Sequence, residues 1–381
     1  MINKWLQYSL MLSVAAVFHI FVADYISFWI LAFLAALPLV SFVFALLAKN
    51  GATAELIIKS SSIQKNEQLP IQLKTYNKHL FMACRVRVKL TIENELLQQK
   101  EDRFFLMTAG HAGQTVEQIV SSDYCGMLRC TIAELRIYDT MGLFSFRKNA
   151  DIRHSVAILP SVYPLMAISS TILQDVENNI TSRTMKGNDP SEIMDVREYR
   201  DTDRIARIHW KLSDKYDQLM VKDFGDPISN DVLLLLDLIG NSPEETCSLL
   251  DAAYSISNFL IKNQLTFEME WYDSIHERSV LNDISQKNDL KSAFEDIMTN
   301  GRCQKQPWVL KSCSRASVQK PYSVVMYLCS EITSNSIDLI YKRLSGSRIY
   351  IMLVTDVPTT RPGITTIDIR NMEDSMKNLV I

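Results

Sequence analysis

Hydrophobic residues dominate the first fifty positions of the chain, in two runs separated by a short break at Ala23 and Asp24. Residues 5–22 and residues 25–48 contain no Asp, Glu, Lys or Arg. Each run is long enough to cross a hydrocarbon layer of roughly 30 Å as an α-helix. The pattern predicts that residues 1–50 form a transmembrane helical hairpin, with the lipid bilayer as a partner.

The charges that flank the two runs predict the orientation of this hairpin. Lys4 precedes the first run and Lys49 follows the second. Because cytoplasmic segments of membrane proteins are enriched in Lys and Arg, both termini are expected in the cytoplasm. A cleaved signal peptide is the alternative interpretation. The second apolar run and the lack of a convincing small-residue cleavage motif argue against it.

Residues 51–150 show a different pattern, in which apolar and polar positions alternate. Within residues 85–93 the even positions are apolar and the odd positions are polar, which is typical of a half-buried antiparallel strand. The alternation recurs at residues 69–73 and 128–132, then slips by one position before Leu135, which predicts a bulge or bend. Several short strands separated by turn residues favour an all-β, immunoglobulin-like sandwich with a packing or spacer role.

Residues 231–381 alternate short apolar runs with longer amphipathic segments. The run DVLLLLDL at residues 231–238 is nearly continuous, as expected for a strand buried on both faces. Alternating strands and helices predict an α/β domain with a parallel sheet covered on both faces. Further strands are expected at 266–273, 322–329 and 348–356, and helices at 243–265, 286–301 and 336–346.

Asp237 follows the first of these strands, where ligands of parallel sheets usually bind. A von Willebrand A-type domain has an Asp-x-Ser-x-Ser metal loop there, whereas this chain reads DLIGNS. Ile239 takes the place of the first Ser and supplies no oxygen, although Mg²⁺ needs several oxygen ligands. Asp237 is therefore only a weak metal candidate, and the alternative is that it caps or orients the following loop. No cofactor is expected.

Composition narrows the classes of function. The formal net charge of −3 gives no reason to expect nucleic acid as a partner. Seven Cys without a CxxC pair argue against a disulfide framework and a zinc ribbon, and favour reduced thiols in the cytoplasm. The common nucleotide-binding, zinc-protease and hydrolase motifs do not occur in the sequence.

The most highly charged segment is residues 196–215, which contain six Arg or Lys and four Asp or Glu. Spacing predicts a helix over residues 202–215 with Thr202 as its N-cap. Trp210 belongs to neither of its two faces and points with Ala206 and Ser213, which suggests a second contact surface. The expected buried face comprises Ile205, Ile208, His209 and Leu212, and the expected basic stripe comprises Arg204, Arg207, Lys211 and Lys215.

Three interpretations of this segment stay open. It is a solvated helix face, on which ion pairs contribute only a few tenths of a kcal/mol. It is a junction, where Arg–carboxylate pairs orient two domains or two proteins. Or it is a hydrolase site that uses His209 and the carboxylates between residues 197 and 214 for acid–base catalysis.

Residues 187–224, GNDPSEIMDVREYRDTDRIARIHWKLSDKYDQLMVKDF, resemble the signature of the bacterial family catalogued as domain of unknown function fifty-eight. Thr202 stands where that family usually has Gly, and Ser213-Asp214 stand where it has Ala-Arg. Residues 139–146 and 158–165 resemble two further family motifs. The matching positions of the signature are Gly187, Arg197, Glu198, Tyr199, Asp203, Arg204, Ile208, Trp210, Lys211 and Phe224.

The resemblance implies two N-terminal spans, a β-domain, a connecting region at residues 151–230 and a degenerate von Willebrand A-like domain at residues 231–381. Members are commonly encoded beside a MoxR-type AAA+ ATPase and transglutaminase-like or von Willebrand A membrane proteins. No biochemical activity is securely assigned to the family.

We therefore expect a non-enzymatic scaffold or adaptor in the bacterial inner membrane. The alternatives are a divalent-metal-dependent adhesion-type binder that uses Asp237 and a hydrolase that uses the cluster at residues 197–214. The predicted interaction residues are Arg197, Glu198, Tyr199, Asp203, Arg204, Arg207, Trp210 and Lys211.

Overall fold

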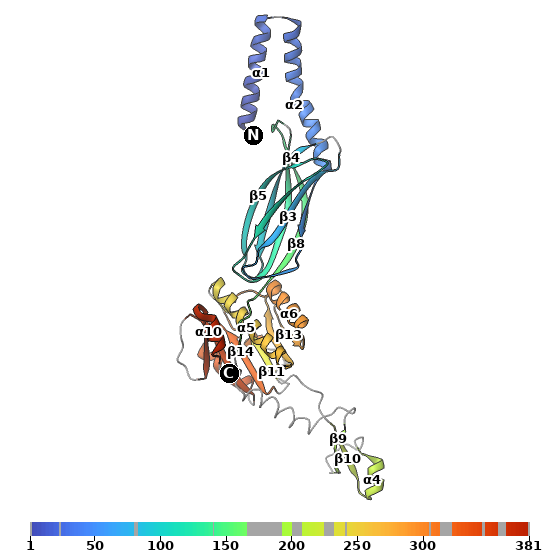
Figure 1. The fold of residues 1–381 in the computed structure, drawn as a ribbon, viewed down its shortest axis with the longest axis vertical. Helices are drawn as coiled ribbons and strands as arrows, with labels where there is room; N and C mark the ends of the chain where they lie inside the picture. Colours follow the sequence, from blue (N-terminus) through green and yellow to red (C-terminus); the bar gives the residue numbers. More distant parts are fainter. Residues whose placement is uncertain are drawn as a thin grey trace. The chain divides into compact units, whose positions relative to one another are not determined.

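The computed structural model divides the chain into two compact units, residues 1–159 and residues 160–381, and each is described by itself. The relative placement of the parts in Figure 1 carries no meaning. The structure describes every residue outside the following positions: 1, 23, 80–82, 140, 166–192, 200–207, 225–231, 241, 305, 313–321, 345–346, 357–362 and 380–381.

The first unit begins with two antiparallel helices, α1 (Ile2–Val22) and α2 (Tyr25–Gly51). Asp24 caps α2, because its side chain accepts a hydrogen bond from the Tyr25 amide at 2.7 Å. Between the helices, Nδ1 of His19 lies 2.7 Å from Oγ of Ser27. Both helices are long and apolar enough to anchor the chain in a membrane.

Two β-sheets follow the helices without a linker, since α2 ends at Gly51 and the first strand begins at Ala52. We call residues 52–159 the β-domain. One sheet has the order β1-β3-β6 and the other β2-β8-β7-β4-β5, and every neighbouring pair is antiparallel except β2–β8. The strands are β1 (Ala52–Ile58), β2 (Ser62–Gln64), β3 (Leu69–Asn77), β4 (Cys84–Asn94), β5 (Gln99–Ala109), β6 (Gln114–Val120), β7 (Gly126–Tyr138) and β8 (Ser145–Leu159).

The two sheets enclose one hydrophobic core, to which the alternating positions contribute their apolar side chains. The apolar residues of β4 are at most 5% exposed, which confirms the alternation predicted for residues 85–93. The predicted slip is also confirmed, because the β7–β8 register shifts between Ile132 and Glu134. The β-domain extends past residue 150, because β8 continues and its Val156 and Ile158 enter the core.

The second unit contains a six-stranded sheet of order β13-β12-β11-β14-β15-β16. Neighbours from β12 to β16 are parallel, but β12 and β13 are antiparallel. The expectation of an all-parallel sheet is therefore wrong at one edge, because the short turn at residues 274–277 returns the chain beside β12. The strands are β11 (Val232–Leu236), β12 (Phe267–Asp273), β13 (Arg278–Ile284), β14 (Val324–Cys329), β15 (Arg348–Thr355) and β16 (Ile364–Asp368).

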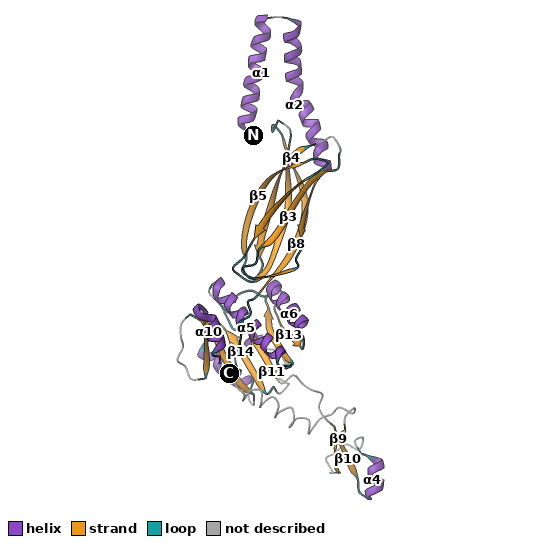
Figure 2. Ribbon diagram, in the orientation of Figure 1, coloured by secondary structure: helices purple, strands orange, loops and turns teal. Residues whose placement is uncertain are grey.

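Helices cover this sheet (Figure 2). Leu233 and Leu235 pack with Val309, Leu310 and Ile340 from two of them. The helices expected near residues 243–265, 286–301 and 336–346 are all present. The helices are α5 (Pro243–Lys262), α6 (Lys287–Asn300), α7 (Trp308–Ser312), α9 (Ser334–Arg343) and α10 (Met372–Lys377), with a 3₁₀ turn, η2 (Ile369–Asn371).

A small module lies within the region that resembles the family signature. It consists of β9 (Ile193–Glu198), α4 (Trp210–Tyr216) and β10 (Met220–Phe224). The two strands are antiparallel, with Arg197 opposite Val221. We call residues 193–199 and 208–224 the signature module.

Candidate functional site

Two segments of the signature module form backbone hydrogen bonds with β10 and the residue before it: β9 with Tyr199, and residues 208–209. Ile208 forms an isolated antiparallel bridge with Val221, and the His209 amide donates to the Met220 carbonyl at 2.8 Å. The Tyr199 amide donates to the Leu219 carbonyl at the same distance, 2.8 Å. Ile208 and His209 therefore pair with β10 and lie outside the helix.

The helix predicted over residues 202–215 is wrong at Ile208 and His209, which precede the helix, and residues 202–207 lie outside the described residues. The helix begins at Trp210, because Nδ1 of His209 accepts a hydrogen bond from the Leu212 amide at 3.3 Å and caps it. It ends at Asp217, whose φ of 53° is left-handed. The basic stripe cannot run as one helical face through residues 208–209, because these residues precede the helix. Asp203, Arg204 and Arg207 lie outside the described residues, as does the side chain of Arg197.

Among the side chains of the module that the structure describes, Trp210 is the most exposed apolar one, with 64% of its surface accessible. Tyr216 and Leu219 are exposed as well. The prediction that Ser213 flanks Trp210 on a contact surface is wrong. Ser213 is buried and its Oγ accepts a hydrogen bond from the Met220 amide at 2.8 Å, so it fixes α4 to β10. Trp and Tyr are the residues that most often dominate protein interfaces.

The other predicted residues of this module are polar or aromatic, and the structure gives the exposure of three of them. Glu198 and Lys211 are exposed, and Tyr199 is half-buried. Among the carboxylates proposed for a hydrolase, Asp214 is exposed, and His209 uses Nδ1 for the helix cap. Trp210 is thus an exposed aromatic side chain in a module that also exposes charged side chains.

Asp237 lies at the end of β11 and is 2% exposed. Its Oδ1 accepts a hydrogen bond from the Val309 amide at 3.1 Å, and its Oδ2 accepts one from the Tyr327 hydroxyl at 2.9 Å. Burial raises the pKa of Asp237 to about 6, against the effect of these hydrogen bonds. Both carboxylate oxygens of Asp237 are thus used in hydrogen bonds within the protein, and these bonds hold α7 and β14 beside β11.

A metal ion at this position would find few ligands. Ile239 is buried at 5% exposure where a metal loop would have a hydroxyl. Among the residues that the structure describes, no group of three or more His, Cys, Asp or Glu side chains is arranged to hold a metal ion.

Two further buried carboxylates, Glu268 and Glu270, were missed by the sequence reasoning. Both lie on β12 and are at most 1% exposed. The Tyr322 hydroxyl donates to Glu268, and the Ser279 hydroxyl donates to Glu270. Their period-two spacing in TFEMEWYD is typical of a solvent-facing side of a strand, and only the helices packed on the sheet show that this side is covered.

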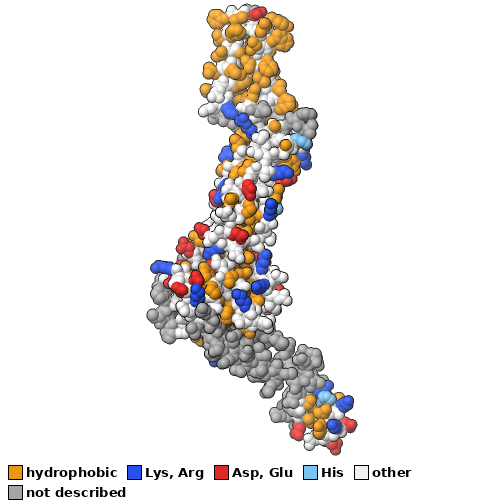
Figure 3. All heavy atoms as spheres, in the orientation of Figure 1, with side chains coloured by type: hydrophobic (Ala, Val, Ile, Leu, Met, Phe, Trp, Pro, Cys, Tyr) orange, Lys and Arg blue, Asp and Glu red, His pale blue; other side chains and the backbone are white. Residues whose placement is uncertain are grey.

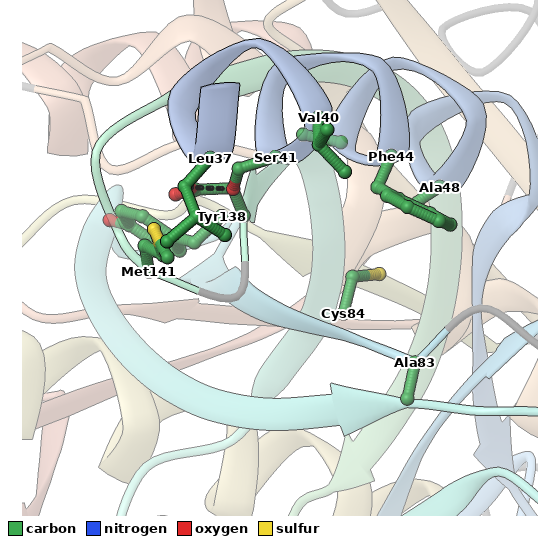
Figure 4. A pocket seen from close by; sticks show the side chains of 11 residues that line it. Leu37, Val40, Ser41, Phe44, Ala48, Ala83, Cys84, Tyr138 and Met141 are labelled. Atoms are coloured by element: carbon green, nitrogen blue, oxygen red, sulfur yellow. Dashed lines mark hydrogen bonds between the residues drawn. The ribbon is translucent and has the colours of Figure 1, made fainter. Parts of the chain in front are cut away.

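The turn between β7 and β8 holds the helical hairpin to the β-domain. Asp139 is 3% exposed; its Oδ2 accepts a hydrogen bond from Oγ of Ser41 on α2 at 2.6 Å (Figure 4). Its Oδ1 accepts one from the Phe144 amide at 3.0 Å. The Phe144 ring lies 5.4 Å from the ring of Trp5 and 5.2 Å from that of Phe42. One turn therefore contacts both helices.

The end of α2 is fixed by Lys148 of β8. Its Nζ donates to the carbonyls of Ala52 at 2.6 Å and Asn50 at 3.3 Å. A lysine suits this place, because the last carbonyls of a helix carry partial negative charge. Burial lowers the pKa of Lys148, as do Lys78 and Lys49.

No family model matches the chain, and no curated protein matches it. Solved structures match parts of it with low TM-scores. The CARDB domain of the PF1109 protein from Pyrococcus furiosus is 12% identical with a TM-score of 0.21, over 28% of this chain and 87% of that one. A cohesin module from a Clostridium perfringens family 33 glycoside hydrolase is 8% identical with a TM-score of 0.21, over 28% of this chain and 96% of that one. The sporulation control protein Spo0M from Bacillus subtilis is 8% identical with a TM-score of 0.18, over 34% of this chain and 56% of that one.

Proposed function

We propose that this protein is a non-enzymatic scaffold or adaptor, anchored in the bacterial inner membrane by α1 and α2. Trp210 carries the proposal, because an aromatic side chain that is 64% exposed is costly to keep in water and suits a protein partner. The favoured partner is a MoxR-type AAA+ ATPase, on the resemblance of residues 187–224 to the domain of unknown function fifty-eight family. Transglutaminase-like or von Willebrand A membrane proteins are further candidates.

The same proposal includes the finer fold and the topology. The two sheets that share one core support an immunoglobulin-like sandwich, and the six-stranded sheet with covering helices supports a degenerate von Willebrand A-like domain. Lys4 and Lys49 at the outer ends of the hairpin support a cytoplasmic position of both termini. The metal-dependent alternative has less support, because both oxygens of Asp237 already accept hydrogen bonds from the protein.

Affinity purification from native membranes, with and without ATP, tests the proposal. The wild type should retain an ATPase, and Trp210→Ala should lose it by about 30-fold, the effect of removing an interface residue worth ~2 kcal/mol. Tyr341→Ala is the matched control, since Tyr341 is an aromatic side chain of α9 with 53% exposure. Equal capture by wild type and Trp210→Ala, or no ATPase with the wild type, would refute the proposed interface.

A further inference from the structure

We propose that the outer face of β4 and β5, beside the first turn of α1, binds the phosphate of an anionic membrane phospholipid. A hollow of about 400 Å³ lies there, and three cationic side chains line it: Lys4, Arg85 and Arg87. The inference goes beyond the scaffold function and rests only on its first part, that α1 and α2 lie in a bilayer.

The alternation of β4 brings these cations to one face. Cys84, Val86 and Val88 enter the core, so Arg85 and Arg87 project from the opposite side of the sheet. Leu106 of β5 lies opposite Arg87 in the register. The guanidinium of Arg87 lies 4.3 Å from the centre of the Phe104 ring. Stacking of this kind orients a guanidinium while its N–H groups stay available for a bidentate contact with phosphate.

The three cations of the hollow form no ion pairs with neighbouring carboxylates of the described chain. Lys89 lies on the same face but pairs with Asp102 at 2.9 Å. Within the described part of the chain, no ion pair joins Lys4, Arg85 or Arg87 to an acidic side chain. Asp139 also lines the hollow, but its oxygens accept hydrogen bonds from Ser41 and Phe144. An anionic ligand would therefore meet three cations and one carboxylate, so the charge of the hollow is positive in sum.

The position of the hollow identifies the ligand as a lipid. Lys4 belongs to the first turn of α1, and its Nζ donates to the Met141 carbonyl at 3.3 Å. The apolar part of α1 begins next to it, with Trp5, a residue typical of the membrane interface. Figure 3 shows Lys and Arg side chains where the two apolar helices meet the β-domain. The hollow thus opens at the depth of lipid headgroups.

Apolar side chains around the cations suit an interface better than water. Phe104 and Leu106 are 53% and 67% exposed on β5. A second hollow, of about 340 Å³, shares Tyr138 and Asp139 with the first and is lined by Val40 and Phe44 of α2 (Figure 4). Headgroup phosphate beside the cations and an acyl chain along α2 would satisfy both hollows. Lipids without a headgroup ammonium fit best, since three cations repel a positive group.

The test uses the full chain, purified in detergent and supplied with equal amounts of phosphatidylglycerol and phosphatidylcholine. Native mass spectrometry counts the lipids retained. Because one cation near an anionic lipid surface strengthens binding about fivefold, Arg85→Gln with Arg87→Gln should weaken phosphatidylglycerol retention by about 25-fold and leave phosphatidylcholine unchanged. The single variant Arg87→Lys should lose only part of the effect, and it keeps the test open if the double variant fails to fold.

A matched control removes two arginines from the same sheet whose charges are already paired. Arg129 pairs with Glu95, and Arg153 with Asp151. Arg129→Gln with Arg153→Gln should retain phosphatidylglycerol as the wild type does. Equal loss in both double variants, or retention of the two lipids in equal amounts by the wild type, would overturn the proposal. So would full competition by inorganic phosphate, which would mean that the hollow binds free phosphate and not a lipid.

The outcomes separate this inference from the scaffold proposal. A chain that stays in the membrane after carbonate washing but shows no lipid preference overturns the phosphate site alone. Loss of the chain from washed membranes overturns the anchor on which both proposals stand. The capture of an ATPase through Trp210 depends on neither the lipid site nor its arginines.

Discussion

Two aspartates of this chain, Asp139 and Asp237, lie in the interior at 3% and 2% exposure. Each accepts hydrogen bonds from the backbone and from one hydroxyl group. Asp139 joins the apolar helix α2 to a turn of the β-domain, whereas Asp237 joins a strand end to a short helix and the neighbouring strand. The same kind of hydrogen bonding thus connects the helical hairpin to the β-domain at Asp139. At Asp237 it fixes neighbouring elements within one sheet domain. An aspartate at a strand end does not by itself indicate a metal site.

Removing the carboxylate of Asp237 should have the largest effect. Asp237→Ala leaves the Val309 amide and the Tyr327 hydroxyl buried without an acceptor, at a cost of about 4 kcal/mol for two such groups. Hydrogen exchange of the β11 and β14 amides, measured on the full chain, reports the loss. Asp338→Ala on the exposed side of α9 is the control and should change little. Unchanged exchange in Asp237→Ala would mean that these bonds do not stabilise the sheet.

The second largest effect should be a dependence of the free energy of unfolding on pH that comes from Asp237. Its folded pKa of about 6 lies above the ordinary value of 3.8, so the folded protein binds the proton more tightly. The resulting stabilisation is fully present below pH ~4 and is lost as pH rises through ~6, with a total of about 3 kcal/mol. Asp237→Asn imitates the protonated side chain and should flatten the curve in this window. Denaturant unfolding of the second unit between pH 4 and 7 measures it, and identical slopes for wild type and Asp237→Asn would contradict the assignment.

The sharpest comparison removes only the hydroxyl group that donates a hydrogen bond to each aspartate. Tyr327→Phe and Ser41→Ala should each cost about 1.5 kcal/mol, the value of a hydrogen bond to a charged group. Tyr327→Phe should accelerate exchange in β11, and Ser41→Ala should do so in the turn that contains Phe144. Ser9→Ala is the control for the hairpin, because Oγ of Ser9 is exposed and donates only to the Leu6 carbonyl of the same helix. Cross effects between the two regions would show that they are not independent.

The smallest expected effect comes from Gly142, in the turn that holds the hairpin. Its φ is +74°, and an added Cβ would lie 2.6 Å from Nζ of Lys4. Gly142→Ala should cost about 1 kcal/mol from the left-handed backbone, while the flexible end of Lys4 moves aside. Thermal unfolding of the detergent-solubilised chain measures it. Gly110→Ala is the control, because Gly110 is not among the positive-φ glycines and the nearest atom to its added Cβ lies at 3.9 Å; equal destabilisation by both would contradict the role of the turn.

The periodicity of apolar residues predicted those helices and strands that bury one clear apolar face. It located the two apolar helices, the alternation of β4, the slip in β7 and the helices α5 and α6. It missed β13 and β16, whose sequences RSVLNDI and ITTID do not show a clear buried face. These edge strands are defined by the neighbours with which they pair.

The sites were harder to predict, because their partners lie far apart in the sequence. The spacing at residues 202–215 fits a helix, yet Ile208 pairs with Val221 and the helix begins only at Trp210. Local propensity is a weak prior against such tertiary pairing. Asp139 was part of the sequence prediction only as the first residue of a motif that resembles the family. Its hydrogen bond with Ser41 spans 98 positions of the chain. Arg85 and Arg87 were recognised as the polar side of a strand, but their meeting with Lys4 needed the fold.

The direct passage from α2 into β1 has a mechanical consequence. Gly51 ends the helix, Ala52 begins the strand, and Lys148 grips the carbonyls on both sides of the joint. Without a flexible linker between them, α2 and β1 change orientation together. In a bilayer whose thickness changes, a helix responds by tilting. If α2 spans a bilayer, a change in its tilt would therefore turn the β-domain with it.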